Sequence, residues 1–338
     1  MNREYQYEQL IQLNKNFLFI DLRSPYEYTK ETIPGAINIP ILDDETRVKV
    51  GTLYDHDHFS EAKSAGVQFV CKNLPKIIQM ILDLDEEKTP VLFCSRGGYR
   101  STILFELCKD LNIPVYKIHG GYKDYRRFIR KKLKEQILSF HFVTLYGLTG
   151  TGKTKILKEL SHLGAQVLDI EDLCNHRGSA LGHIGLGEQP SQKMFESILY
   201  EHLSNFHKSQ IIYTEGESQR VGKLLLPQSL YQKINEDTKI LITASMNKRI
   251  AIIKEEYTHY PKSLLHETIG NLKNILPPKK LRQFQEQIED ENFEALIREL
   301  MVHYYDPKYR HGHHHFEKQF ENIDEKKTAL DILENYGL

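Results

Sequence analysis

The feature that most constrains this chain is the octapeptide GLTGTGKT, residues 147–154. It matches the phosphate-loop pattern G-x-x-x-x-G-K-[ST] at every fixed position. The β-branched and aromatic run before it (residues 140–146) predicts a buried strand, and the apolar spacing after it predicts a helix. A strand, a glycine turn and a helix start direct successive amide groups and the positive helix end at one point. We therefore expect an α/β domain that binds a phosphate compound, rather than a glycine turn without a ligand.

The residues of this loop expected to bind phosphate are Gly147, Gly150, Thr151, Gly152, Lys153 and Thr154. Lys153 would reach the outer phosphate oxygens, which makes it a candidate catalytic residue, and Thr154 is a candidate ligand of a magnesium ion. The loop does not indicate which phosphate compound it holds.

Further strands are predicted at residues 165–169, 210–214 and 239–243, with helices from about residue 248 to the C-terminus. Asp169 and Glu215 follow two of these strands, where each is either a magnesium ligand or merely a helix cap or solvated carboxylate. The neighbouring glycine-containing loops carry candidate contacts to substrate or RNA phosphate: His176, Arg177, Ser179, Glu217, Ser218 and Arg220.

The first part of the chain also alternates strands with helices. Strands are predicted at residues 16–21, 90–93 and 115–118, with a short one after the turn near residue 35, and helices at 74–84 and 101–111. This alternation is typical of a parallel sheet, which collects its ligands at the carboxyl ends of the strands. Cys94 lies at such an end.

The loop after Cys94 predicts an anion cradle. Its backbone amides would wrap around the sulfur, and the start of the next helix would add its dipole. The cradle residues are Ser95, Arg96, Gly97, Gly98 and Tyr99. Such a site stabilises a thiolate, a persulfide or a similar anion, and Arg100 adds a positive charge at its rim. Cys94 and Arg100 are therefore candidate catalytic residues, whereas the other cysteines are expected to be structural or incidental.

A basic segment, residues 126–134 (RRFIRKKLK), precedes the predicted boundary between domains of residues 1–134 and 135–338. It fits both a solvated helix face and a contact with an RNA backbone. Near the C-terminus, Tyr305, Tyr309 and Arg310 have side chains that could stack on bases or contact phosphate, and their assignment as RNA contacts comes mainly from the family resemblance given below. The histidines of residues 311–315 lack a Cys or Asp partner at metal-site spacing, so we interpret them as a solvated, partly RNA-facing tail rather than a metal site.

Composition excludes some classes of protein. A net charge of −1 argues against bulk coating of nucleic acid, although it leaves a local basic face open. The four cysteines show no disulfide or metal spacing, which indicates a reducing compartment. The N-terminus is unlike a signal peptide, and no apolar run approaches the ~20 residues that span a bilayer. We expect a soluble, cytoplasmic protein without a membrane partner.

Three motifs of the first part resemble the rhodanese family of sulfurtransferases: DLRSPYEY (residues 21–28), IPGAINIP (residues 33–40) and the Cys94 loop. The resemblance covers about residues 15–130. Thr32 stands where rhodaneses carry a histidine, a departure expected to affect only packing. Five residues separate Cys94 from Arg100, one more than in typical sulfurtransferases and as many as in rhodanese-like phosphatases. The roomier cradle suits a larger anion, such as phosphate or a selenium species.

The pairing of a rhodanese domain with a phosphate-loop domain resembles the tRNA 2-selenouridine synthase family over essentially the full length. Further segments that carry this resemblance are residues 47–54 (RVKVGTLY), 175–182 (NHRGSALG), 215–222 (EGESQRVG) and 305–309 (YDPKY). The implied fold is a rhodanese-like parallel-sheet domain followed by a P-loop NTPase-like α/β domain with a helical C-terminal part.

The resemblance implies a transferase that acts on tRNA carrying 2-thiouridine at the wobble position. A geranyl group from geranyl diphosphate is attached to the sulfur, and selenium from selenophosphate then replaces the S-geranyl group. The phosphate loop, with Lys153 and magnesium, would stabilise the departing diphosphate. Cys94 would either carry selenium or help to expel geranylthiol. No tightly bound cofactor is implied, and the enzyme that produces selenophosphate is a candidate partner.

Two other functions fit the same motifs. One is an ATP-dependent kinase or nucleotidase fused to a rhodanese-like sulfurtransferase or phosphatase, which would turn over ATP without tRNA. The other is a non-catalytic RNA-binding or sensor protein with two vestigial anion sites. The presence of Cys94, Arg100, Lys153 and Thr154 together disfavours the second, because a vestigial site has no chemical reason to keep all four.

Overall fold

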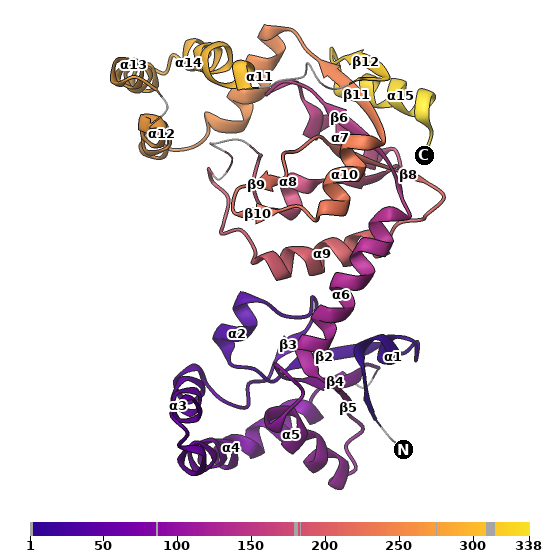
Figure 1. Ribbon diagram of the computed structural model, residues 1–338. Helices are drawn as coiled ribbons and strands as arrows, with labels where there is room; N and C mark the ends of the chain where they lie inside the picture. The colour runs from indigo at the N-terminus through magenta and orange to yellow at the C-terminus, as the bar shows by residue number, and fades with distance from the viewer. Residues whose placement is uncertain (1–2, 86, 179–181, 183, 275, 309–314) are drawn as a thin grey trace. The chain divides into compact units, whose positions relative to one another are not determined.

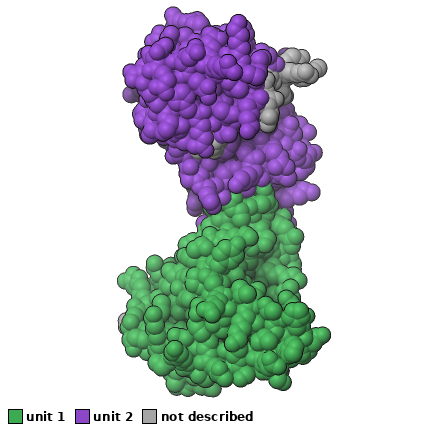
Figure 2. Space-filling model, turned by 90° about the vertical axis from the view of Figure 1, so that its left-hand side faces the viewer, with its two compact units in different colours: residues 1–133, 190–200 green, residues 134–189, 201–338 purple. Residues whose placement is uncertain are grey.

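The computed structural model describes residues 3–85, 87–178, 182, 184–274, 276–308 and 315–338. These fall into two compact units (Figure 2): unit 1 comprises residues 1–133 and 190–200, and unit 2 comprises residues 134–189 and 201–338. The sequence-based boundary assigns residues 190–200 to the second domain. In the structure they pack with unit 1, where Arg126 of the basic segment forms an ion pair with Glu196 and donates to Ser197 Oγ at 2.8 Å.

Unit 1 is built on a five-stranded parallel sheet in the order β1-β5-β4-β2-β3 (Figure 1), as the alternation of strands and helices predicted. The strands are β1 (Glu4–Tyr5), β2 (Phe17–Asp21), β3 (Ile37–Asn38), β4 (Thr89–Phe93) and β5 (Tyr116–Ile118). The helices are α1 (Tyr7–Ile11), α2 (Pro25–Lys30), α3 (Asp44–Asp55), α4 (Phe59–Leu82), α5 (Tyr99–Asp110) and α6 (Gly121–Leu138), the last of which continues into unit 2.

Successive side chains of β4 point to opposite faces of this sheet and are buried on both. Val91 and Phe93 pack in one core cluster, while Leu92 packs in another with Cys108 of α5. A strand buried on both faces holds its carboxyl end rigidly, which positions Cys94 directly after it.

Several elements of unit 1 lie beyond the predicted ones. The predicted helix at residues 74–84 is only the last part of α4, a long helix that continues through Pro75, and α3 was not predicted. The sequence of α3 is mostly polar and none of its residues is buried, so it lacks the apolar periodicity from which a helix is recognised. Helix α6 begins at Gly121, before the basic segment of residues 126–134, and continues beyond it.

Unit 2 contains a second five-stranded parallel sheet, in the order β12-β11-β6-β8-β7, and a short antiparallel pair, β9 with β10. The strands are β6 (His141–Tyr146), β7 (Gln166–Leu168), β8 (Ile211–Glu215), β9 (Arg220–Val221), β10 (Leu224–Leu225), β11 (Thr238–Thr243) and β12 (Lys318–Glu321). The helices are α7 (Lys153–His162), α8 (Ile170–Leu173), α10 (Gln228–Glu236), α11 (Met246–Tyr257), α12 (Lys262–Gly270), α13 (Pro278–Glu289), α14 (Phe293–Leu300) and α15 (Glu325–Tyr336). Helix α9 (Gln192–Ser204) belongs to unit 1 up to Tyr200 and to unit 2 from Glu201.

Short turns of other helix types join some of these helices: η1 (Asn271–Asn274), η2 (Met301–Tyr305) and η3 (Asp306–Lys308). The prediction of helices from about residue 248 to the C-terminus is wrong at β12, which pairs with β11. Its four residues, KQFE, are mostly polar and exposed at a sheet edge, so they carry no strand pattern. Within the described parts of the chain, no helix combines the length and apolar character needed to cross a bilayer.

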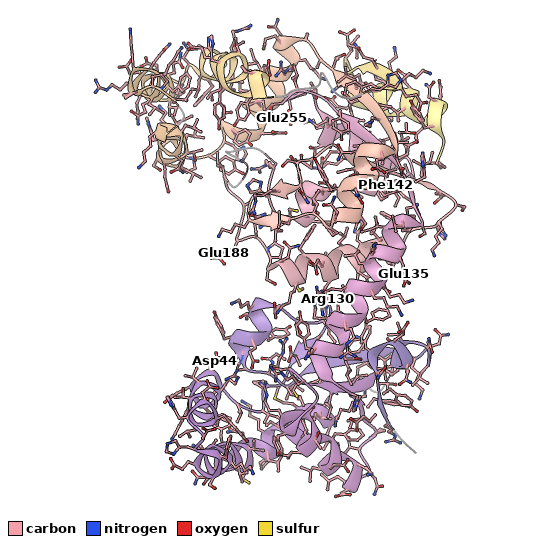
Figure 3. The ribbon with its side chains drawn as sticks, viewed as in Figure 1. Asp44, Arg130, Glu135, Phe142, Glu188 and Glu255 are labelled. Carbon is pink, nitrogen blue, oxygen red and sulfur yellow. The ribbon has the colours of Figure 1, made fainter. Side chains whose placement is uncertain are left out.

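The basic segment lies on α6, and its side chains differ in their exposure to solvent. Arg126 is buried in its ion pair, whereas Arg130, marked in Figure 3, and Lys131 are exposed. Arg126 is therefore a structural residue, and only the exposed side chains remain available to a partner.

Candidate functional site

The phosphate-loop segment joins the central strand of unit 2, β6, to α7, in the strand–loop–helix context that its sequence predicts. Gly150 and Gly152 have φ values of +77° and +86°, in the left-handed region that favours glycine. Lys153 Nζ donates to Gly147 O at 3.0 Å, across the mouth of the loop. Within the described chain, the backbone amides of residues 148–150 and 152 donate to no other group. The loop thus presents unused donors to an anion.

Two residues far away in the sequence hold this loop in shape. Arg249 of α11 is buried, donates to Thr149 O at 2.8 Å and pairs with both carboxylate oxygens of Asp306, at 2.6 and 3.0 Å. Asn322, directly after β12, donates to Thr151 O at 2.8 Å. Sequence reasoning missed these residues, because nothing local in the sequence connects them with the loop.

A cavity of about 490 Å³ opens beside the loop. It brings together eight of the predicted site residues of unit 2: Gly150, Gly152, Lys153, Thr154, Asp169, His176, Arg177 and Glu217. Arg177 also donates to Ile184 O at 2.7 Å and to the Tyr260 hydroxyl at 3.2 Å, which ties the segment after α8 to the turn that follows α11.

Several other predicted residues lie away from this cavity. Ser218 and Arg220 are exposed and do not line the cavity, so the structure does not bring them to the loop. Tyr305 lines a separate, apolar cavity. The predicted contacts Ser179, Tyr309 and Arg310, and four of the five residues of the histidine-rich segment (residues 311–314), lie outside the described residues.

Four carboxylates gather near the phosphate loop, and Lys153 interacts electrostatically with three of them: Glu171, Glu215 and Glu217. Glu215 is buried; its Oε1 accepts from the backbone of Glu171 at 2.9 Å, and its Oε2 has no partner within the described chain. Burial and the charge of Glu217 raise the pKa of Glu171 to about 8. Burial and the charge of Glu215 raise the pKa of Glu217 to about 7, and burial also raises the pKa of Asp169. Like charges crowded in a buried place favour either bound protons or a bound cation.

Asp169 has a structural role as well, since its side chain caps α8 by accepting from Asp172 N at 2.9 Å. Glu171 was missed in the sequence because it lies inside this short helix rather than at a strand end. In the described part of the chain, no group of three or more His, Cys, Asp or Glu side chains is arranged to hold a metal ion by itself.

The cysteine loop of unit 1 joins β4 to α5. Cys94 is buried, and its Sγ lies 3.2 Å from Ser101 Oγ in the first turn of α5. The backbone amides of Ser95, Arg96, Gly97 and Gly98 donate to no other group of the described chain. The sulfur thus sits at a helix start beside a row of unused donors, an arrangement that suits an anion.

Arg100 is held in place by a residue that the sequence analysis did not single out. Its Nη1 donates to Glu27 Oε2 at 2.7 Å, and its Nη2 donates to Ser95 Oγ at 2.7 Å. Burial opposes ionisation of Glu27, but hydrogen bonding and the charge of Arg100 outweigh it and lower the pKa of that carboxyl. The signal in the sequence was the capping box of Ser24 and Glu27 at the start of α2, which indicates a helix but not a partner.

Thr32, which replaces the histidine of typical rhodaneses, donates from its hydroxyl to Asp21 Oδ2 at 2.9 Å. The same carboxylate is paired with Arg23 at 2.6 Å in the core. Thr32 therefore completes a buried hydrogen-bond network.

The turn before α6 closes the back of the cysteine loop. Tyr122 N donates to Cys94 O at 2.8 Å, and Lys123 N donates to Ser95 O at 3.0 Å. Gly121 has a φ of +58°, and a Cβ there would lie 2.1 Å from Cys94 O and 2.5 Å from Gly97 N. The backbone of the turn and the backbone of the cysteine loop therefore approach so closely that a side chain at Gly121 does not fit between them.

Replacing Gly121 by alanine is expected to destabilise unit 1 by about 2–4 kcal/mol, because left-handed strain adds to a clash with backbone atoms. Thermal unfolding followed by circular dichroism measures this loss. The matched control is Gly35→Ala, whose φ is +72° but whose Cβ would meet nothing within 4 Å, so only the strain of about 1–2 kcal/mol applies. Equal stability of the two variants would contradict the packing described here.

Comparison with known proteins assigns a family to each of the two parts of the chain. Residues 5–127 match the model of the rhodanese-like domain, and residues 140–275 match that of the tRNA 2-selenouridine synthase AAA domain. The chain is 36% identical to tRNA 2-selenouridine synthase of Marinobacter nauticus over 70% of this chain and 65% of the relative. It is 33% identical to tRNA 2-selenouridine synthase of Nitrosomonas europaea over 77% of this chain and 67% of the relative. It is 29% identical to that of Hydrogenovibrio crunogenus over 95% of this chain and 93% of the relative. The chain belongs to the tRNA 2-selenouridine synthase family.

Proposed function

We propose that this protein catalyses two consecutive reactions on the 2-thiouridine at the wobble position of tRNA. The first attaches a geranyl group from geranyl diphosphate to the sulfur, and the second replaces the S-geranyl group by selenium from selenophosphate. The relatives named tRNA 2-selenouridine synthase support the product. The observation that carries the first reaction is an apolar cavity adjoining the phosphate-loop cavity.

This apolar cavity, of about 80 Å³, shares Thr149, Ile253 and Tyr257 with the wall of the phosphate-loop cavity. By the same measure a single water needs ~10–15 Å³, so the cavity has room for several atoms of a chain. Its other walls come from the helices after α11 and include Leu265, Ile269, Phe293, Leu296 and Leu300. A polar site for phosphate beside an apolar one matches the two ends of an allylic diphosphate.

In the first reaction the base sulfur forms a bond to the allylic carbon, while the bond from that carbon to the diphosphate oxygen breaks. Negative charge grows on the diphosphate as it leaves. The loop amides and the Lys153 ammonium stabilise this charge, and in the ligand-free loop the ammonium is held at Gly147 O, 3.0 Å away. No nucleotide has to be hydrolysed in this scheme.

The carboxylates beside Lys153 fit a magnesium ion. The buried Oε2 of Glu215, which has no hydrogen-bond partner among the described residues, and the raised pKa values of Glu171 and Glu217 are features that a cation would relieve. Thr154 and Glu215 would hold the ion together with water and substrate oxygens, because magnesium in phosphate sites usually takes only one or two carboxylates from the protein. When bound, magnesium neutralises charge on the departing diphosphate.

Replacing Leu265 by phenylalanine is expected to lower kcat/KM for geranyl diphosphate by about tenfold or more, because the larger ring fills space in the apolar cavity, and Leu265 does not line the phosphate-loop cavity. The shorter dimethylallyl diphosphate should be affected less. Steady-state geranyl transfer to tRNA, with both diphosphates, measures the ratio. Leu264→Phe is the matched control, since Leu264 is its neighbour on α12 but does not line the cavity. An equal loss for both diphosphates would contradict this assignment.

In the second reaction, the cysteine loop is the proposed site of selenium chemistry. Its unused amides suit the negative charge of selenophosphate, and Arg100, fixed by Glu27, adds a positive charge at the rim of the loop. Cys94 then acts next to the selenium atom, either by carrying it or by helping geranylthiol to leave.

The proposal is tested by mass spectrometry of tRNA nucleosides after incubation of the protein with geranyl diphosphate and then with selenophosphate. We expect S-geranyl-2-thiouridine after the first addition and 2-selenouridine after the second. ATP turnover without tRNA, together with unmodified nucleosides, would instead identify a kinase or nucleotidase.

A further inference from the structure

A cavity of about 820 Å³ opens beside Cys94 in unit 1. Its wall is formed by α3 and α4, which lie side by side (Figure 1); Asp44, labelled in Figure 3, marks the start of α3. The cysteine loop and α5 form the other side. Its apolar lining includes Val50, Ala62, Val67, Val70, Leu74 and Ile103.

Several of these apolar side chains are open to solvent. Val67 is 53% exposed and Ile103 is 46% exposed, and Tyr99 of the cysteine loop, which also lines the cavity, is 71% exposed. Burying such surface is worth roughly 25 cal/mol per Å², so the cavity favours a hydrocarbon ligand. Exposed apolar residues that surround a concave site are typical of a binding pocket rather than of an ordinary surface.

The side of the cavity next to the sulfur is charged. Arg100 and Arg47 both line the cavity and both face Glu27, with distances of 2.7 and 3.6 Å to its Oε2. Both arginines are suited to bind selenophosphate or tRNA phosphates, which are anions. Neither has a part that needs an apolar wall, so the wall implies a second, hydrocarbon portion of the substrate within reach of Cys94.

We infer that this pocket binds the geranyl chain of S-geranyl-2-thiouridine while the sulfur is exchanged for selenium. The inference rests on the proposed function and assigns a second geranyl site, separate from the one beside the phosphate loop. The intermediate carries a long apolar group on the atom that must leave, and that group has to lie near Cys94 when selenium is delivered. The α3–α4 wall keeps it out of water at that moment.

The exchange that the pocket serves balances in atoms and charge. The selenium of selenophosphate forms a bond to C2 of the base, and the bond from C2 to the geranyl sulfur breaks. The electron pair leaves with the sulfur as geranylthiolate, which takes a proton from water. Water then cleaves the bond between selenium and phosphorus, releasing phosphate and leaving 2-selenouridine.

The test is selenation of tRNA that already carries S-geranyl-2-thiouridine, with S-methyl-2-thiouridine tRNA as a second substrate. Val67→Asp places a charge in the pocket and is expected to lower kcat/KM for the S-geranyl tRNA by about tenfold or more. The S-methyl tRNA should lose little, and geranyl transfer should not change. Val48→Asp is the matched control, because Val48 is a 64% exposed valine of the neighbouring helix that does not line the pocket.

A binding measurement supports the kinetic one. Geranylthiol, the released product, should inhibit selenation by the wild type, and Val67→Asp should raise its inhibition constant about tenfold. Unchanged inhibition together with unchanged preference for the S-geranyl tRNA would overturn the pocket assignment while leaving the proposed function intact. If the wild-type protein fails to selenate S-geranyl tRNA at all, both the proposed function and the pocket fall.

Discussion

Replacing Lys153 by alanine is expected to slow geranyl transfer to tRNA by about 10²–10³-fold, the usual effect of removing one charge-stabilising donor from an active site. The ammonium group is the only part of the lysine that the reaction needs, since it meets the charge that appears on the departing diphosphate. Lys153→Met, which keeps the apolar stem, should therefore be as slow as Lys153→Ala. The rate is measured by the appearance of S-geranyl-2-thiouridine under single-turnover conditions.

The control separates the two reactions. Selenation of tRNA that has been geranylated beforehand should proceed in Lys153→Ala at the wild-type rate, because that step uses the cysteine loop. Lys326→Ala, which removes an exposed lysine of α15 in the same unit, should leave both reactions unchanged. A normal rate of geranyl transfer in Lys153→Ala would remove the phosphate loop from the reaction, and an equal loss of both steps would refute the division of labour.

The two anion loops were predictable because each is a contiguous segment. In both, the strand before the loop, the glycines within it and the helix after it stand next to one another in sequence, so spacing alone defines the geometry. The parallel sheets followed in the same way from the alternation of strands and helices.

The supports of these loops were not predictable, because they come from distant parts of the chain. Arg249 and Asn322 contact the phosphate loop from α11 and from the residue after β12, and Glu27 fixes Arg100 from α2. A charged or amide side chain gives no local sign of which buried backbone group it will satisfy. The apolar pockets could not be predicted for the same reason. Their walls combine side chains from several helices, such as Leu265 of α12 and Leu296 of α14.

Replacing Cys94 by alanine is expected to abolish selenium incorporation, with a loss of about 10³-fold or more, because it removes the thiol that acts next to the selenium atom in the amide cradle of the cysteine loop. Cys94→Ser should be equally inactive. It keeps a hydrogen-bonding atom next to Ser101 Oγ, 3.2 Å from the present sulfur, and so preserves the shape of the loop while removing the thiol. The measurement is the conversion of S-geranyl-2-thiouridine to 2-selenouridine in tRNA, followed by mass spectrometry.

Two controls give this result its meaning. Geranyl transfer by Cys94→Ala should stay within about twofold of the wild type, because the effects of mutations at sites without shared contacts are normally independent. Cys108→Ala should keep selenation. Cys108 lies on the buried face of α5, where burial raises the pKa of its thiol to about 11, so the thiol stays protonated. If Cys94→Ala still made 2-selenouridine at the wild-type rate, the Cys94 thiol would take no part in the exchange, and the cysteine loop would be only a binding site. If geranyl transfer were lost together with selenation, the two loops would serve one reaction, because a thiol that takes no part in prenyl transfer cannot control its rate.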